Sequence, residues 1–351
     1  STTATNNTML GMQAGYTTTT GSNSVGIGKS ALYYNTTGEN NVAVGNSALL
    51  DNTTASNLVA VGYQALSNNT TGGSGVAIGY NALEENTTGS GNTAVGRQAL
   101  EENTTGGTNT GVGYLALNAN ITGAGNVGLG YQALLGNTTA SYNVAVGREA
   151  LKLNTTGTSN VAVGYEALLV NSTASNNTAV GYQAGYTNQT GVGITAFGAR
   201  ALYATTASDN CGIGTDNPGN YAAALESNST GRFNTAVATG ALGSNTTGQY
   251  NSALGHQALA SNTTADNNTA VGYRSLNTNT TGTENVAMGK DALFTNNGSY
   301  NVGIGENSLS SNSSGSNNVS VGRRALFSNT TANNNSALGF HALFSNTTGT
   351  A

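Results

Sequence analysis

The chain has 351 residues, of which 50 are Gly, and a formal net charge of −5 with only 7% charged residues. This charge provides neither a basic stripe for phosphates nor an acidic tail, so we expect no nucleic-acid partner. Aromatic residues make up 6%, Trp is absent and Cys211 is alone, which excludes an ordinary aromatic-rich globular core and intrachain disulfides.

A repeat starts near the first residues and continues along most of the chain. A Gly that follows an apolar residue recurs every 17 residues, and after an irregular stretch the series resumes with one step of 16. Its members are Gly28, Gly45, Gly62, Gly79, Gly96, Gly113, Gly130, Gly147, Gly164, Gly181 and Gly198, and then Gly255, Gly272, Gly289, Gly305, Gly322 and Gly339. Such regular spacing argues against a disordered low-complexity chain. We therefore expect solenoid repeats over 1–198, an irregular coil or insertion over 199–237, and solenoid repeats over 238–351.

Each repeat combines a strand pattern with a turn pattern. Segments such as NVAVG alternate and are rich in Val, while the Asn-Thr-Thr-Gly segments are typical of turns. A 17-residue unit is too short for the common repeats built from two helices. The sequence predicts an all-β fold, a parallel β-solenoid or β-roll of about 20 coils. Each coil is expected to contain two short strands joined by tight turns.

Two apolar positions are predicted to form the interior. The residue before each Gly is apolar, and the fourth residue after it is Leu in nearly every coil. The first set includes Ile27, Val44, Val61, Ile78, Val95, Val112, Leu129 and Val146, and the second includes Leu32, Leu49, Leu66, Leu83, Leu100, Leu117, Leu134 and Leu151. The Gly between them is interpreted as the corner that turns one strand into the next.

A third position carries only small residues, on the opposite strand face from the Val positions. Solvent would not require small side chains, so we interpret this ladder as a surface where a second copy of the chain approaches closely. The ladder consists of Ala43, Ala60, Ala77, Ala94, Gly111, Gly128, Ala145 and Ala162. In the alternative interpretation, this face lines a narrow interior and the Val positions face a partner. Two large side chains per coil return less free energy than ordering 17 residues costs, so both interpretations favour self-association.

The two ends and the irregular region leave further alternatives open. The segment STTATNNTMLG matches the turn and strand of internal coils, and SNTTGTA ends in a turn. Uncapped coils expose strand edges, so the chain is either a segment of a longer protein or stacks head to tail. The region 199–237, which contains Cys211 and Pro218, is either a degenerate coil or an insertion that protrudes as a contact loop.

The turns contain one N-x-[ST] acceptor sequence in most coils. A row of such residues could carry a glycan ladder, or the Asn and Thr side chains could simply satisfy turn backbones. The candidate glycosylation residues are Asn35, Asn52, Asn69, Asn86, Asn103, Asn120, Asn137, Asn154, Asn171, Asn245, Asn262, Asn279, Asn329 and Asn346.

Aromatic and hydroxyl side chains suggest two binding alternatives. A Tyr often follows the corner Gly, and an aromatic strip can stack on sugars, although Tyr also suits an exposed strand. These residues are Tyr63, Tyr80, Tyr114, Tyr131, Tyr165, Tyr182 and Tyr273. Repeated Thr also suggests an ice-binding solenoid, but ice-binding faces need Thr at alternate strand positions, and Thr87 and Thr88 are adjacent in a turn.

No pattern indicates catalysis, a metal site or a cofactor site. The segment GIGKS at 26–30 lacks the earlier Gly of a phosphate-binding loop and is a repeat variant. His256 and His341 lie in different coils, five repeats apart, without metal or triad spacing. Glu84, Glu85 and their equivalents one coil later, Glu101 and Glu102, are expected to be solvated charges. Apolar runs such as EALLV are too short to span a bilayer.

The segments NSVGIGKSAL, NVAVGNSAL and GVAIGYNAL resemble the head repeats of trimeric autotransporter adhesins. The unit NTAVGYQAL followed by NTTG, and the segment CGIGTDNPGNYAAAL, are similar to repeats of phage-type tail fibres. The resemblance implies a left-handed parallel β-roll with three chains side by side. The 17-residue unit is longer than that of the adhesin heads.

These patterns lead to one functional expectation with two alternatives. We expect a non-enzymatic structural fibre at an extracellular, cell-surface or virion-surface location, which assembles with copies of itself side by side or head to tail. The first alternative is an adhesin or tail-fibre segment that binds host-surface glycans, and the second is an ice-binding solenoid.

Overall fold

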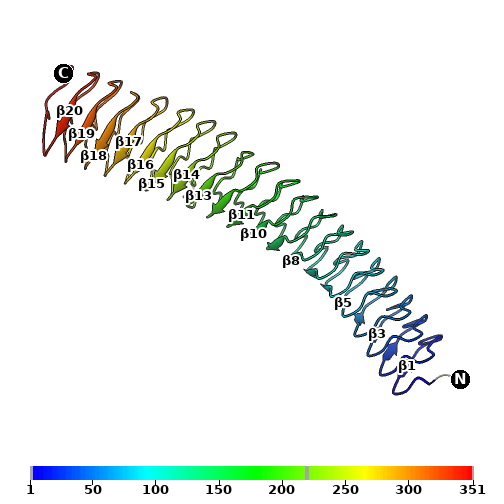
Figure 1. The fold of residues 1–351 in the computed structure, drawn as a ribbon. Coiled ribbons are helices and arrows are strands. Elements are labelled where there is room, and N and C mark those ends of the chain that lie inside the picture. The colour runs from blue at the N-terminus through cyan, green and yellow to red at the C-terminus, as the bar shows by residue number, and fades with distance from the viewer. Residues whose placement is uncertain (1–2, 218–220, 350–351) are drawn as a thin grey trace. The chain divides into compact units, whose positions relative to one another are not determined.

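A computed structural model describes residues 3–217 and 221–349. These residues form strands and turns and contain no helix. The chain divides into two compact units, Ser1–Asn176 and Asn177–Ala351. Each unit is a stack of coils with one strand per coil (Figure 1). The fold is all-β, as the alternating sequence pattern predicts.

The strands have three residues each. The first unit contains β1 (Thr8–Leu10), β2 (Val25–Ile27), β3 (Val42–Val44), β4 (Val59–Val61), β5 (Val76–Ile78), β6 (Thr93–Val95), β7 (Thr110–Val112), β8 (Val127–Leu129), β9 (Val144–Val146) and β10 (Val161–Val163). The second contains β11 (Thr178–Val180), β12 (Thr195–Phe197), β13 (Cys211–Ile213), β14 (Thr235–Val237), β15 (Ser252–Leu254), β16 (Thr269–Val271), β17 (Val286–Met288), β18 (Val302–Ile304), β19 (Val319–Val321) and β20 (Ser336–Leu338).

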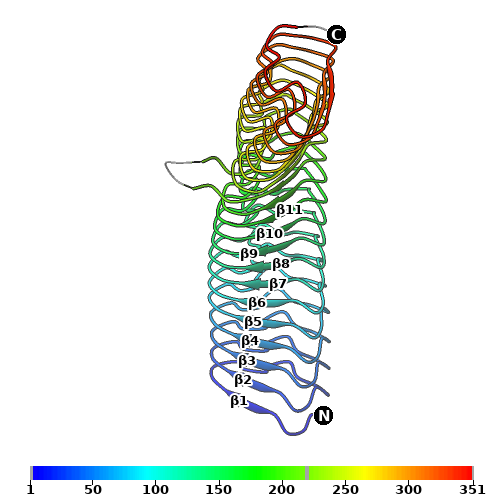
Figure 2. The same ribbon diagram turned by 90° about the vertical axis from the view of Figure 1, so that its left-hand side faces the viewer.

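Consecutive strands pair in parallel within each unit. In the first unit, Val42 pairs with Val59 and Ala43 with Ala60, one repeat further along the chain. The labels β1 to β9 follow one another in chain order along the stack (Figure 2). Because equivalent residues of successive coils are partners, the 17-residue sequence period is the structural period of a parallel β-solenoid.

Within residues 3–217 and 221–349, each coil contains one strand, so the predicted second strand is wrong. The segment after the corner Gly is a series of turns, in which Ser47 has a φ of 58° and Leu49 a φ of 52°. Left-handed residues at alternate positions cannot maintain an extended strand. The corner itself is confirmed, since Gly45 has a φ of 141° and a Cβ there would collide with the carbonyl group of Gly62 in the next coil.

The interior consists of Leu and Ala columns. Leu49 and Ala43 are both 0% exposed, whereas Val44 is only half-buried. The Leu ladder is therefore confirmed as core, but the assignment of the Val ladder to the interior is wrong. The small-residue ladder is also corrected: it is buried inside a single chain and cannot contact a second copy. Its members are Ala43, Ala60, Ala77, Ala94, Gly111, Gly128, Ala145 and Ala162, and the six Ala residues are 0% exposed.

Limited space explains why the small residues face inward. The central residue of a three-residue strand points away from the side on which its two neighbours lie. At Gly111, an added Cβ would already lie 3.3 Å from the Leu100 side chain and 3.2 Å from the Ala116 carbonyl oxygen. In most coils the Leu column therefore leaves room for little more than a methyl group, and the larger Val side chains occupy the outside. Ser320 of β19 is a buried exception, with its hydroxyl bonded to the Ala325 carbonyl.

The region 199–237 keeps the solenoid register. Strands β13 and β14 lie within it, and Cys211 pairs with Thr195 on one side and with Thr235 on the other. The extra residues of this region fall between the corner at Gly214 and the next buried Leu, Leu225. Asn217 and Tyr221 pair in an antiparallel bridge. The described green ribbon just before and just after residues 218–220 projects from the coils of the second unit (Figure 2). Pro218 lies outside the described residues.

Candidate functional site: the outward strand face

Both outward positions of each strand are apolar in most coils of the first unit. Of the eighteen outward residues in β2 to β10, sixteen are Val, Ile or Leu and two are Thr. They are Val25, Ile27, Val42, Val44, Val59, Val61, Val76, Ile78, Thr93, Val95, Thr110, Val112, Val127, Leu129, Val144, Val146, Val161 and Val163. All are half-buried or exposed. We call these two columns the outward strand face.

The outward strand face of the second unit is more mixed. The last residue of each strand stays apolar, with Phe197 55% and Met288 43% exposed. The other column contains Thr, Ser and Cys as well as Val, for example Thr195, Cys211 and Ser252. No charged residue occurs in either column of β11 to β20. Each unit therefore presents an uncharged strip along its coils.

A Tyr and Arg column lies next to this face, directly after the corner Gly. The rings of Tyr63 and Tyr80 stack at 5.3 Å, and Tyr114 and Tyr131 stack at the same distance. Arg97 fills the coil between these pairs, with its guanidinium 5.5 Å from the Tyr80 ring and 5.9 Å from the Tyr114 ring.

This stacking changes the expectation of a sugar-binding aromatic strip. A sugar packs on the face of an aromatic ring. Here, the faces of Tyr80 and Tyr114 contact neighbouring groups of the same column, so ring edges and hydroxyl groups point outward. Tyr63, Tyr80 and Tyr131 are 45%, 47% and 44% exposed. The column is thus suited to hydrogen bonding and to stabilising the coil stack.

The candidate glycosylation residues form a buried ladder in the turns, so their assignment as glycan carriers is corrected. Asn52 Nδ2 donates to Asn35 Oδ1 at 2.7 Å and to the Ala55 carbonyl at 3.1 Å. The amide nitrogen that a glycan would occupy is therefore engaged inside the coil. Buried in this way are Asn35, Asn52, Asn69, Asn86, Asn103, Asn120, Asn137, Asn154, Asn171, Asn245, Asn262, Asn279 and Asn329, each at most 1% exposed. Asn346 is half-buried in the last described coil.

A second buried Asn ladder precedes the strands and was not identified from the sequence. The backbone N–H of Asn126 donates to Asn109 Oδ1 at 2.9 Å, and Asn126 Nδ2 donates to the Ala140 carbonyl at 2.8 Å. The available signal was the Asn that stands directly before many strands, as in NVAVG and NTAVG. The two ladders satisfy the polar backbone of the turns that lie against the core.

The Thr residues of the turns do not form a face of free alternate hydroxyls. Thr36 Oγ1 donates to the Thr53 carbonyl at 2.9 Å, and Thr70 Oγ1 donates to the Thr87 carbonyl at 2.9 Å. Ice-binding would need Thr at both alternate outward positions of the strands. In β2 to β10 these positions are mainly Val, and in β11 to β20 the second of the two is always apolar. These contacts make the first Thr of each pair a link between coils.

Some charged residues form ion pairs, such as Arg200 with Glu226 at 2.8 Å and Arg274 with Asp291 at 2.8 Å, but the two His residues lie among aromatic rings. His256 packs against the rings of Tyr221 and Tyr273, and His341 lies beside Phe340. Within residues 3–217 and 221–349, no three His, Cys, Asp or Glu side chains gather closely enough to hold a metal ion. Burial raises the pKa of Glu84, and the nearby carboxylates of Glu101 and Glu85 raise it further.

The described part of the chain has no helix with the length and apolar character that crossing a bilayer requires. No protein-family model matches the sequence, and comparison with curated proteins finds no match either. The fold and its surfaces are therefore the basis for a functional assignment.

Proposed function

We propose that this chain is a non-enzymatic structural protein of an extracellular, cell-surface or virion-surface fibre, in which copies assemble side by side through the outward strand face. The supporting observation is the pair of apolar columns on β2 to β10. Soluble monomers rarely expose a continuous apolar patch of more than a few hundred Å². These columns approach that size in one unit.

The area of the face supports a protein interface. Strands lie about 4.8 Å apart and alternate residues about 6.8 Å apart, so nine strands with their side chains cover roughly 400 Å². A standard interface buries about 800 Å² on each partner. The two units together supply roughly this area, so both units contribute to assembly in this proposal.

A second copy is the partner that fits the face best. Its columns repeat at the spacing of the coils, and only a surface with the same period can match them over many coils. The columns carry no charge, so they provide no electrostatic selection for an acidic or basic partner. A second copy has the same period and the same uncharged face.

The resemblance to adhesin heads and tail fibres adds a more specific proposal. Three chains side by side would let each outward strand face contact neighbouring copies. The alternative role, adhesion to host-surface glycans, would then depend on surfaces outside this interface.

The proposal is tested by placing a charge on every second coil of the face. Val44→Lys, Ile78→Lys and Val112→Lys in one chain should convert the assembly to monomers, because each ammonium group would be desolvated in the interface. Sedimentation velocity measures the change, and negative-stain electron microscopy shows whether single or multiple chains form the fibre.

A matched variant separates the position of the charge from its number. Thr54→Lys, Thr88→Lys and Thr122→Lys add the same three charges at exposed turn residues in the same part of the coil stack. This variant should assemble like the wild type. The proposal is wrong if the wild type sediments as a monomer at high concentration, or if the charged face assembles as well as the turn variant.

A further inference from the structure

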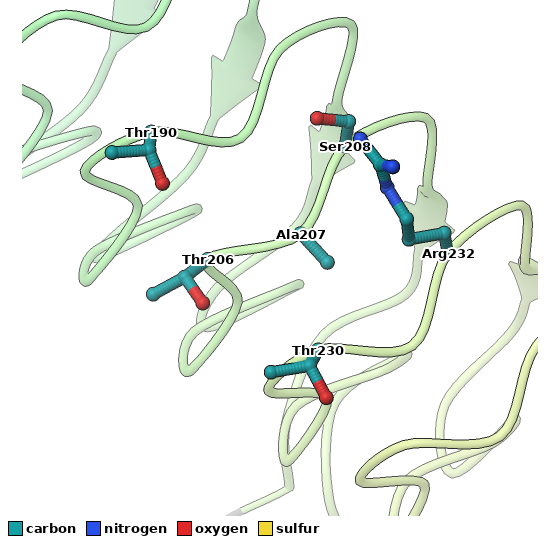
Figure 3. Close-up of a pocket in the computed structure, with 6 residues that line it drawn as sticks. All are labelled: Thr190, Thr206, Ala207, Ser208, Thr230 and Arg232. Atoms are coloured by element: carbon teal, nitrogen blue, oxygen red, sulfur yellow. The ribbon is translucent and has the colours of Figure 1, made fainter.

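One coil of the second unit is a residue short. From Gly198 to Gly214 the step is 16, and Thr205-Thr206-Ala207 stands where other coils have Asn-Thr-Thr-Gly or Asn-Thr-Thr-Ala. The second Thr of the turn is missing between Thr190 of one neighbouring coil and Thr230 of the other. The omission leaves a notch of about 250 Å³, lined by Thr190, Thr206, Ala207, Ser208, Thr230 and Arg232 (Figure 3).

A backbone donor in this notch has no acceptor. In many other coils, the side chain of the next coil accepts the equivalent N–H: Ser56 Oγ accepts from Glu39 N–H at 2.9 Å, and Ser208 Oγ accepts from Val192 N–H at 3.1 Å. Where the next coil has Gly at this position, as after Ser56 and Ser90, the N–H has no side-chain acceptor, but those two residues are half-buried or exposed. The next residue in this series is Arg232, whose guanidinium only donates. The N–H of Ser208, a residue that is 6% exposed, therefore makes no hydrogen bond within the described residues.

The positive charge of Arg232 has no carboxylate partner among the described residues, and its guanidinium carbon lies 5.9 Å from the centre of the Phe233 ring. Its guanidinium extends toward Ser208 (Figure 3). Among residues 3–217 and 221–349, no carboxylate lies within 4.0 Å of it. Glu226 and Asp216, the two nearest acids along the chain, pair with Arg200. In the adjacent coil, Asp209 Oδ1 lies over Gly193 of the coil before it, 3.1 Å from where a Cβ would stand. Arg232 belongs to the following coil, so Asp209 is directed away from it.

The remaining wall of the notch consists of hydroxyl groups. Thr206 Oγ1 donates to the Ser229 carbonyl at 3.0 Å and keeps its lone pairs free to accept. The side chains of Thr190 and Thr230 line the notch with hydroxyl and methyl groups (Figure 3). The notch thus combines two donors suited to an oxyanion with neutral groups that can accept and donate hydrogen bonds.

A second short coil shows that the omission alone does not create these donors. Between Gly289 and Gly305 the step is also 16. There, Asn297 Oδ1 accepts from Thr280 N–H at 2.8 Å, and Ser316 Oγ accepts from Ser299 N–H at 3.1 Å. Ser316 occupies the position that corresponds to Arg232 in the coil after the first short coil. The N–H of Ser299, which corresponds to that of Ser208, therefore has an acceptor.

We propose that the notch between Thr190, Ser208 and Arg232 binds a saccharide that carries a carboxylate or sulfate group. The acidic group lies against the Arg232 guanidinium and the Ser208 N–H, and the sugar hydroxyls face the Thr residues. This proposal is independent of self-association, because the notch lies on the turns and not on the outward strand face.

Arg232→Ser provides a sharp test in the full-length chain. Ser at this position restores the acceptor for Ser208 N–H found in other coils, so the variant should fold at least as well as the wild type. Ligand-observed saturation-transfer NMR with D-glucuronate and glucose 6-sulfate measures binding. Loss of a charge-assisted hydrogen bond should weaken binding of the acidic sugars at least about tenfold. Arg323→Ser, which removes an exposed Arg in another coil, should bind them like the wild type.

The comparison ligands distinguish the parts of the proposal. Glucose should show no saturable transfer, and inorganic sulfate should compete only weakly with glucose 6-sulfate. Equal binding of the acidic sugars to the wild type and Arg232→Ser, or no binding to either, overturns the proposal. Competition by inorganic sulfate at the same concentration as the sulfated sugar overturns the saccharide part, because the Thr wall would then contribute nothing.

Discussion

Single residues in this solenoid occupy backbone conformations that ordinary strands avoid. Leu49 is fully buried at a φ of 52°. A left-handed conformation costs about 1–2 kcal/mol for a side-chain-bearing residue, and burial of a Leu side chain returns about 1.5–3 kcal/mol. Where the Leu is absent, Gly15 and Gly185 take the position, each at a φ of 60°. The conformation of this residue is therefore kept even when the core contact is lost.

The corner position gives a prediction with opposite signs in two coils. Gly45→Ala should destabilise the chain by about 3 kcal/mol or more, because it combines an unfavourable φ with a collision against the next coil. Ala238 already occupies a corner, at a φ of 106°. Ala238→Gly should stabilise the chain by about 1 kcal/mol through relief of backbone strain.

Denaturant unfolding followed by circular dichroism measures both changes. The unfolding midpoints are compared because long repeat arrays depart from two-state behaviour. A shift in the same direction for both variants would contradict the role assigned to the corner.

At the scale of the coil, the sequence period predicts the strand pairing correctly, whereas the residue types do not predict which strand face is buried. The spacing of the corner Gly residues correctly places every pairing from β2 to β10, because a solenoid has one structural repeat for each sequence repeat. Which strand face is buried could not be read from the same pattern. Val44 is larger and more apolar than Ala43, so ordinary core rules place it inside. The Leu column decides otherwise, since it leaves space for only a methyl group at Ala43.

For the candidate sites, too, the sequence period predicts which residues align in a column, but not whether their side chains are buried. The Asn of each turn was identifiable as a ladder, but burial of Asn52 Nδ2 depends on the close approach of Asn35 and Ala55. The notch beside Arg232 depends on a missing residue and an unsatisfied N–H. Neither feature is a motif, so only the three-dimensional contacts identify them.

The reactivity of the Cys211 thiol can be used to measure how accessible the outward strand face of the second unit is. Its thiol is half-buried in β13, and burial raises its pKa above the ordinary value. At pH 8 the reactive thiolate should therefore be rarer than in the unfolded chain, and alkylation by iodoacetamide should be slower. The rate should rise as the pH approaches the raised pKa.

Self-association adds a concentration dependence to this rate. If copies cover the outward strand face, alkylation of Cys211 should slow further as the protein concentration increases. The same reaction in denaturant provides the reference rate. A folded chain that reacts as fast as the denatured chain at pH 8 would contradict the assigned burial.

At the scale of the whole molecule, both units repeat one uncharged surface within a chain that has 7% charged residues. The polar groups that hold the coils together lie in the turns and the Asn ladders, on other sides of each coil. The proposed assembly and the internal cohesion of the coils would thus depend on different chemistry. In the proposed assembly, the apolar columns would provide the contact between copies, while hydrogen bonds between neighbouring coils provide the stack itself.

This division predicts how assembly responds to salt and temperature. Raising NaCl from about 0.1 M to about 1 M screens charge interactions strongly, but it should leave assembly through the outward strand face unchanged or slightly stronger. Cooling should weaken assembly, because hydrophobic association loses strength at low temperature. Binding of acidic sugars at Arg232 should instead weaken at high salt. Sedimentation velocity and saturation-transfer NMR on the same samples separate the two responses. Dissociation of the assembly by salt would show that charged groups, and not the Val columns, hold the copies together.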